Sequence, residues 1–201
     1  GPFTTSTLQQ SSSAKLGFGT SRTMQISQRL YQGIDIEGDS VGLITYMRTD
    51  GTNISNEAVS LFRSYIENNF GKKYLPNQPL NYSGKKSKNA QEAHEAIRPT
   101  DVNRSLAELK KYLSSDQFKL YNLIWSRTLS SQMEPAKFDR KTILIASKDG
   151  SNTFKANGSV IKFDGFLKLY KIEDENSEDK TLPDVEKGKV YLQDFVDEQH
   201  F

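Results

Sequence analysis

The segment Ile44-Thr45-Tyr46-Met47-Arg48-Thr49-Asp50 contains two residues whose types and spacing could carry out chemistry. A tyrosine hydroxyl can act as a covalent nucleophile, although an ordinary pKa near ~10 keeps it protonated at neutral pH. Arg48 follows Tyr46 by two positions, so both side chains would point to the same side of an extended strand. The guanidinium could then stabilise the phenolate and hold a phosphate oxygen. Because Tyr-x-Arg is a common pattern, the spacing alone favours a half-buried strand tyrosine followed by a surface charge.

The elements around this segment are predicted to be mostly helical before Pro135 and mostly extended after it. Apolar residues at helical spacing predict an amphipathic helix over 55–70, with Ser55 as its N-cap. Other helices are expected at 4–16, 20–33, 106–113 and 117–133, and a short strand at 41–46. Alternating and β-branched residues predict strands at 142–146, 153–157, 160–163, 166–170 and 189–196. The sequence therefore predicts an α+β protein, with a helical domain over 1–136 and a β-rich part over 137–201.

The composition excludes several classes of function. Only 35% of the 201 residues are hydrophobic, and the sequence contains no apolar run of the roughly 20 residues that cross a bilayer. Without cysteine there is no disulfide, no thiolate nucleophile and no cysteine-bound zinc. The two histidines, His94 and His200, are far apart in the sequence, which argues against a histidine metal site.

The charge distribution differs between the two parts of the chain. Residues 1–140 carry 18 basic and 13 acidic residues, a net charge of +5, whereas residues 141–201 carry 9 and 12, a net charge of −3. This imbalance permits binding to nucleic acid but does not require it. The lysines between positions 72 and 88 are interpreted as a solvated polar loop rather than as a DNA track.

Several motifs stand in one order along the whole chain, and together they resemble the type IA DNA topoisomerases, the bacterial topoisomerase I class. They are Pro2-Phe3-x-Thr5-Ser6-Thr7-Leu8-Gln9, Leu16-Gly17-Phe18, Gln28-x-Leu30-Tyr31, Ile44-Thr45-Tyr46-x-Arg48-Thr49-Asp50, Thr52-Asn53-Ile54-Ser55, Gln91-Glu92-Ala93-His94-Glu95-Ala96-Ile97-Arg98-Pro99 and Phe163-Asp164-Gly165-Phe166. One departure is Gly51, where the family often has serine. That change is expected to affect the flexibility of the turn more than the chemistry.

The resemblance implies roles for five residues. Tyr46 takes the position of the nucleophile that attacks single-stranded DNA and forms a 5′-phosphotyrosine link, and Arg48 takes the position of the arginine beside it. His94 lies in the block that touches DNA near the active site. Arg98 would either bind a phosphate or hold its loop through a carboxylate such as Glu92 or Glu95. Asp50 would either orient Arg48 or cap the turn at the following glycine.

The resemblance also implies what the complete enzyme does and contains. It would relax negatively supercoiled DNA by transient single-strand cleavage, strand passage and religation, without ATP. Its Mg²⁺ would be bound by an acidic cluster in an N-terminal Toprim domain. Because this sequence has no Asp-x-Asp-x-Asp motif, we expect a central fragment that binds no metal and is inactive alone, with 137–201 contributing to the gate domain.

The expected partners are single-stranded DNA and the remaining domains of the same enzyme, in a cytoplasmic, nucleoid-associated protein. Two alternatives remain open at this point. One is a non-catalytic module for single-stranded nucleic acid, in which Tyr46 only stacks or packs. The other is the same domain of topoisomerase III or reverse gyrase.

Overall fold

The computed structural model describes residues 1–82, 94–170 and 181–191, and it separates the chain into two compact units. The first unit is Gly1–Ala136 with Asp164–Ile172, and the second is Lys137–Phe163 with Glu173–Phe201. The division begins at residue 137, as in the domain prediction. The second unit differs from the predicted 137–201 domain because Asp164–Ile172 belongs to the first unit.

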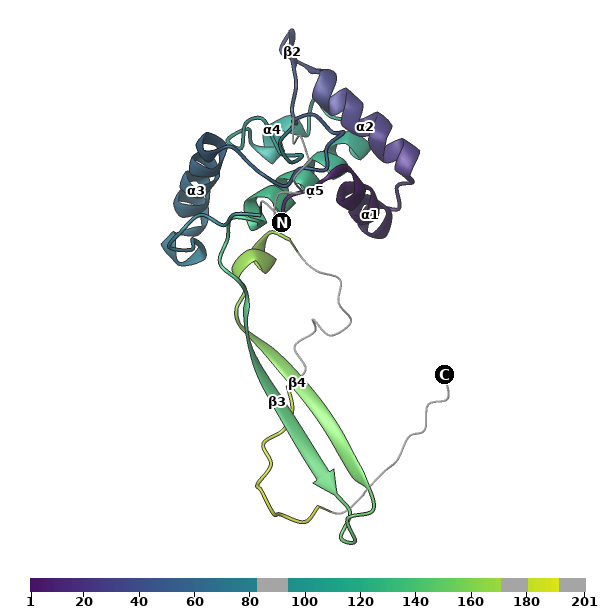
Figure 1. Cartoon of the computed structure of the whole chain (residues 1–201), viewed down its shortest axis with the longest axis vertical. Coiled ribbons are helices and arrows are strands. Elements are labelled where there is room, and N and C mark those ends of the chain that lie inside the picture. The colour runs from purple at the N-terminus through teal and green to yellow at the C-terminus, as the bar shows by residue number, and fades with distance from the viewer. Residues whose placement is uncertain (83–93, 171–180, 192–201) are drawn as a thin grey trace, which may run out of the picture. The chain divides into compact units, whose positions relative to one another are not determined.

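The regular secondary structure of the first unit is mainly helical. They are α1 (Thr5–Leu16), α2 (Thr20–Gln32), α3 (Asn56–Phe70), α4 (Leu106–Leu109) and α5 (Ser115–Ser130), with two 3₁₀ turns at Lys72–Tyr74 and Gly165–Lys168. Helix α5 lies in the middle of the unit and packs against α1, α2 and α3 (Figure 1). Its inward side chains are among the most buried in the chain, and they are Leu120, Tyr121, Ile124 and Leu129. The predicted α+β class is confirmed.

Local sequence signals explain where these helices begin. Thr4 and Thr7 form a reciprocal capping box at the start of α1, and Ser114 and Gln117 form another at the start of α5. Ser55 accepts a hydrogen bond from the Ala58 amide at the start of α3, as its N-cap prediction requires. In the described residues no helix is long and apolar enough to cross a membrane.

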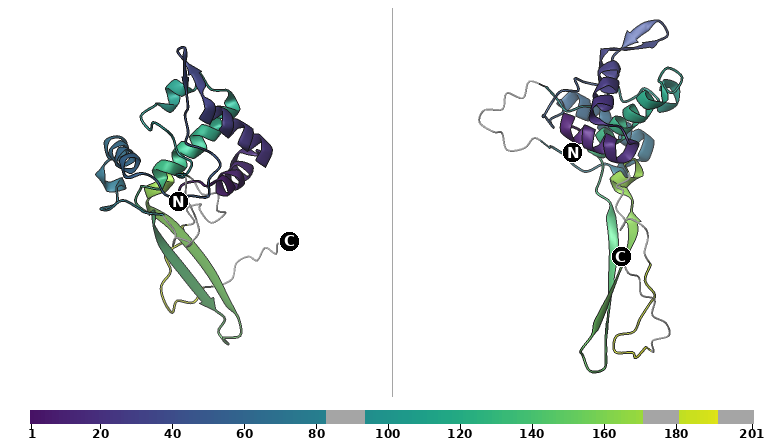
Figure 2. Two further views of the ribbon diagram at one scale, coloured as in Figure 1. Left: turned by 45° about the horizontal axis from the view of Figure 1, so that its top comes forward. Right: turned by 90° about the vertical axis from the view of Figure 1, so that its right-hand side faces the viewer.

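The connection after α2 is a small hairpin, β1 (Ile34–Ile36) and β2 (Asp39–Val41), which projects from the helices in both views of Figure 2. The predicted strand over 41–46 is wrong, since β2 ends at Val41 and only Ile44 makes an isolated bridge, to Pro99. Residues 41–46 have side chains typical of a strand. Their backbone groups, however, bond singly to different segments of the chain rather than to one continuous strand.

The second unit contains one long antiparallel hairpin, β3 (Lys137–Ala146) and β4 (Thr153–Phe163). The strands predicted at 142–146, 153–157 and 160–163 all lie within it. The strand predicted at 166–170 is wrong, because Gly165 takes a left-handed φ of 49° and begins a 3₁₀ turn. The strand expected at 189–196 is absent from its described part, 189–191, and the rest lies outside the described residues.

Candidate active site

The segment from Leu43 to Asn53, which contains Tyr46 and Arg48, connects the hairpin to α3 without regular secondary structure. Backbone hydrogen bonds fix it from two sides. The Leu43 amide donates to the Leu30 carbonyl at the end of α2, at 2.7 Å. On the other side, the segment 94–100 follows it, through Thr45 N to Arg98 O at 2.9 Å, Thr100 N to Leu43 O at 3.0 Å and Ala96 N to Asn53 O at 2.9 Å.

Two threonine hydroxyls add to these backbone contacts. Thr45, directly before Tyr46, donates to the Ala96 carbonyl at 2.8 Å and accepts from the Arg98 amide at 3.0 Å. Thr5, in the first turn of α1, accepts from the Thr49 amide at 2.9 Å and donates to the Met47 carbonyl at 2.8 Å. The backbone on both sides of Tyr46 and of Arg48 is therefore fixed by residues that are distant in the sequence.

Tyr46 is half-buried and lies between two other aromatic rings. The centroid of its ring is 4.8 Å from that of His94, and 5.4 Å from that of Tyr31 in an edge-to-face arrangement. Both geometries are favourable aromatic contacts. The Tyr46 hydroxyl makes no hydrogen bond to any residue in the described part of the chain, so it is available to a substrate.

Arg48 is exposed, and its guanidinium forms no ion pair or hydrogen bond with the residues that the structure describes. The prediction that Tyr46 ends a strand is wrong, so strand alternation does not determine which way the two side chains point. Burial indicates their direction instead. Met47 between them is only 2% exposed, which leaves Tyr46 and Arg48 on the solvent side of the segment.

The guanidinium of Arg98 bonds to residues of its own loop. Its Nε lies 2.6 Å from Glu95 Oε2, and its Nη1 donates to the Pro99 carbonyl at 3.1 Å. Of the two predicted roles, the loop-holding contact through Glu95 is therefore present, whereas Glu92 lies outside the described residues. His94 is exposed, and its imidazole ring lies against that of Tyr46.

Asp50 makes neither of its predicted contacts among the described residues. The amide of Gly51 bonds instead to the Thr49 hydroxyl, at 3.0 Å. A Cβ at Gly51 would lie 2.6 Å from the His94 carbonyl oxygen, so the glycine permits a close approach of the two backbones. This departure from the family pattern therefore affects how closely the backbone at His94 lies against the segment that contains Tyr46.

The sequence pattern gave no role to Thr5 or Tyr31, which the structure places against the segment that contains Tyr46. Both residues belong to the motifs shared with the topoisomerases, and that membership is the signal that could have identified them. The described residues contain no group of three or more His, Cys, Asp or Glu side chains suited to a metal ion.

Comparison with known proteins agrees with this architecture. A family model described as DNA topoisomerase matches residues 1–200. DNA topoisomerase 1 of Rickettsia felis is 48% identical over 204 residues, covering 100% of this chain and 26% of that protein. The protein of the same name from Salmonella typhimurium is 47% identical, covering 100% of this chain and 22% of its own length.

A solved structure gives the same result in three dimensions. Full-length topoisomerase I from Thermotoga maritima superposes with a TM-score of 0.76 at 41% identity, over 92% of this chain and 29% of that chain. The chain thus spans about a quarter of the length of the relatives it matches. Since the family model, the relatives and the solved structure agree over nearly all of its residues, the chain belongs to the type IA DNA topoisomerases.

Proposed function

We propose that this chain provides the nucleophile of an enzyme that relaxes negatively supercoiled DNA by transient cleavage of one strand. The observation that supports this most directly is Tyr46, whose accessible hydroxyl lies beside His94 in a segment that also exposes Arg48. The relatives carry the name DNA topoisomerase 1, which gives the reaction class.

The reaction exchanges one phosphodiester for another. The Tyr46 hydroxyl loses its proton as its oxygen attacks a backbone phosphorus of single-stranded DNA. The bond from phosphorus to the 3′ oxygen breaks, and the released 3′ oxygen takes up a proton. A second strand passes through the gap, and the 3′-hydroxyl then attacks the phosphotyrosine to restore both the strand and the tyrosine. Because the number of phosphodiester bonds is conserved, no ATP is needed.

The site's side chains have separate tasks in this scheme. Negative charge increases on the phosphate in the transition state, and Arg48 is the exposed cation placed to offset it. His94 would contact the same phosphate or the attacking oxygen, while Arg98 holds the His94 loop through Glu95. Magnesium would be held by carboxylates of another domain, and cleavage would take place on chromosomal DNA in the cytoplasm.

The experiment that tests this proposal traps the covalent intermediate. In the complete enzyme that contains this chain, Tyr46→Phe should abolish the protein–DNA adduct recovered after denaturation and leave noncovalent binding of single-stranded DNA unchanged. Tyr191→Phe, an exposed tyrosine of the second unit, is the matched control and should leave the adduct intact. An adduct that survives in Tyr46→Phe would refute the proposal.

A second candidate is a non-catalytic module that binds single-stranded nucleic acid. Three partly accessible rings, those of Tyr31, Tyr46 and His94, would suit base stacking, which contributes about 1–3 kcal/mol per base. The same experiment separates the two functions, because phenylalanine at position 46 stacks but cannot attack phosphorus. If no Tyr46-dependent adduct forms in the complete enzyme, the binding module is the better description.

A further inference from the structure

Tyr31 contacts Tyr46 but has no task in the reaction scheme. The centroids of the two rings lie 5.4 Å apart and the ring planes are inclined by 66°, which is an edge-to-face contact. Tyr31 is 41% exposed, and its hydroxyl makes no hydrogen bond within the part of the chain that the structure describes. Among the described interactions of this side chain, the ring contact with Tyr46 is the one that bears on the reaction.

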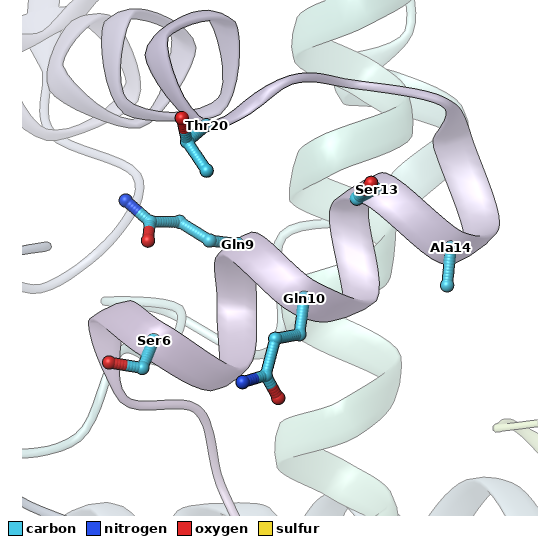
Figure 3. Close-up of a pocket in the computed structure, with 6 residues that line it drawn as sticks. All are labelled: Ser6, Gln9, Gln10, Ser13, Ala14 and Thr20. Atoms are coloured by element: carbon cyan, nitrogen blue, oxygen red, sulfur yellow. The ribbon is translucent and has the colours of Figure 1, made fainter.

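The backbone of Tyr31 is held by a firmly packed helix. Tyr31 belongs to the last turn of α2, which packs against α1 and α5. The start of α2 lies beside α1, where Thr20 and Gln9 line the same surface pocket (Figure 3). Four residues of α2 are buried, and they are Thr23, Ile26, Ser27 and Leu30. The Tyr31 ring therefore projects from a fixed position in the first unit.

The chain around Gly42 brings Tyr31 and Tyr46 together, although they are fifteen positions apart. After α2 the chain forms the β1–β2 hairpin and returns at Gly42, where the Leu43 amide donates to the Leu30 carbonyl at 2.7 Å. A Cβ at position 42 would lie 2.7 Å from the carbonyl oxygen of Tyr31, which is too close for non-bonded atoms. Glycine at this position therefore lets the returning segment lie against the end of α2.

The orientation of the Tyr46 side chain depends on the rings around it. The segment from Leu43 to Asn53 has no regular secondary structure, and its backbone hydrogen bonds fix peptide groups but not side-chain torsions. The ring of Tyr46 lies between that of Tyr31 and that of His94, whose centroid is 4.8 Å away. Contacts on two sides exclude some of the rotamers that an exposed tyrosine would sample. They thereby determine where the Tyr46 hydroxyl points.

We propose that Tyr31 is a positioning residue of the cleavage reaction, whose ring holds Tyr46 in the orientation from which its oxygen attacks phosphorus. The inference rests on the proposed function, because it assumes that Tyr46 is the nucleophile. A reacting group that is held in line before the reaction gains rate, and a small displacement of it lowers the rate strongly. Because Tyr31 acts on Tyr46 and not on the DNA, it should affect the rate of attack rather than the affinity for DNA.

The first test replaces Tyr31 in the complete enzyme and measures the single-turnover rate of adduct formation separately from equilibrium binding of a single-stranded oligonucleotide. Tyr31→Leu should lower the rate about threefold to tenfold, because an aromatic pair favours its own geometry by about that factor. The affinity should stay unchanged. Tyr31→Phe keeps the ring and should restore the rate.

Two results of this test would overturn the proposal. Equal losses of rate and affinity in Tyr31→Leu would show that the ring contacts DNA. A loss in Tyr31→Phe as large as that in Tyr31→Leu would assign the effect to the hydroxyl and not to the ring contact.

The matched control is Tyr65→Leu in α3. The Tyr65 ring also makes an edge-to-face contact, with Trp125, at a centroid distance of 5.7 Å and an interplanar angle of 89°. Tyr65→Leu therefore removes a similar aromatic contact elsewhere in the first unit. It should lower the thermal unfolding midpoint as Tyr31→Leu does and leave the rate of adduct formation unchanged. If both variants lose the same rate, general destabilisation explains the loss and the proposal is refuted.

Gly42→Ala tests the same contact with the Tyr31 side chain intact. The added methyl group should push the returning segment away from the end of α2 and lower the rate of adduct formation. Combined with Tyr31→Leu it should have little further effect, because both changes act through one contact. Gly19→Ala, at the other end of α2, adds a Cβ that meets no atom within 4 Å and should leave the rate unchanged. Additive losses in the double variant would contradict the proposal.

Fluorine NMR of the complete enzyme with fluorotyrosine at position 46 reports the orientation of the ring without DNA. The resonance should shift in Tyr31→Leu and stay in place in Tyr31→Phe, because the neighbouring ring current is lost only in the first. An unchanged resonance in Tyr31→Leu would overturn the proposal.

The adduct assay separates failure of this role from failure of the proposed function. An adduct that persists in Tyr46→Phe would overturn the proposed function and this role with it. A Tyr46-dependent adduct that Tyr31→Leu forms at the full rate would overturn the role of Tyr31 alone.

Discussion

The hydroxyl of Thr5 accepts a hydrogen bond from the Thr49 amide at 2.9 Å, while the Thr5 amide donates to the Thr49 carbonyl at the same distance. The same hydroxyl donates to the Met47 carbonyl at 2.8 Å. One side chain at the start of α1 therefore fixes the peptide groups on both sides of Arg48. The position of Arg48 therefore depends on α1 as well as on the segment that contains Tyr46.

Replacing Thr5 by valine should weaken this anchor. The substitution keeps the shape of the side chain but leaves the Thr49 amide and the Met47 carbonyl without their partner, at a cost of about 1–3 kcal/mol in the free energy of unfolding. Urea denaturation of the chain measures the loss, and cleavage by the complete enzyme should fall with it. Thr5→Ser keeps the hydroxyl and should restore both. If serine behaves like valine, the hydrogen bonds are not what holds the segment.

Arg48→Ala in the complete enzyme should reduce cleavage far more than DNA affinity. One lost phosphate contact changes affinity modestly, whereas removing a charge-stabilising group from a transition state costs about 10²- to 10³-fold in rate at comparable sites. Single-turnover adduct formation and equilibrium binding measure the two effects separately. Arg140→Ala, an exposed arginine of the second unit, should change neither to this extent. Equal losses in rate and affinity would leave Arg48 as a simple anchor for DNA.

Two substitutions at His94 should separate ring packing from imidazole chemistry. Phenylalanine keeps an aromatic ring against Tyr46, whereas alanine removes it. If an imidazole nitrogen contacts the reacting phosphate, both variants should lose about tenfold to a hundredfold in the rate of adduct formation. Alanine should also lower the thermal unfolding midpoint slightly, because the ring contact is lost. Normal cleavage by His94→Phe would restrict the residue to packing.

Acidification should loosen the contact between the β1–β2 turn and the residues after α4. The Tyr112 hydroxyl donates to Glu37 Oε1 at 2.7 Å, and this bond, together with the nearby Lys111 charge, lowers the pKa of Glu37 below its ordinary value of 4.5. Since the folded state favours the carboxylate, the contact contributes fully above that ordinary value and is lost as the pH falls through the lowered one. Amide hydrogen exchange in the turn reports the opening. Glu37→Gln should remove this pH dependence, and an unchanged profile would show that another group is responsible.

The 201-residue chain alone should not relax supercoiled plasmid, with or without magnesium. The resemblance assigns the metal to a Toprim domain whose acidic motif this sequence lacks, and strand passage would require the rest of the gate. Agarose gel electrophoresis after incubation with plasmid measures relaxation directly. Relaxation that disappears in Tyr46→Phe would mean that this chain contains a complete active site.

The sequence by itself determined where most of the helices lie and which motif contains Tyr46 and Arg48. Ser55 stands at a helix start whose signal lies within a few residues, so local chemistry was sufficient to predict it. The start of α5 was predicted at 117, two residues after its observed start at Ser115. Tyr46 and Arg48 were identified by their order in a motif, which needs no knowledge of the fold. The long strands of the second unit were also predictable, since β3 pairs with β4, its neighbour in the sequence.

The tertiary structure decided what surrounds Tyr46. Thr5 contacts Thr49 and Met47 across more than forty positions, and His94 reaches Tyr46 from a loop beyond α3. The strand expected at 41–46 does not form because its backbone groups bond to residues of α2 and of the segment 94–100 instead. Such contacts depend on which distant segments the packing of α1, α2 and α5 brings together. Secondary-structure propensity and hydrophobic periodicity describe neighbouring residues only, so they do not predict these contacts.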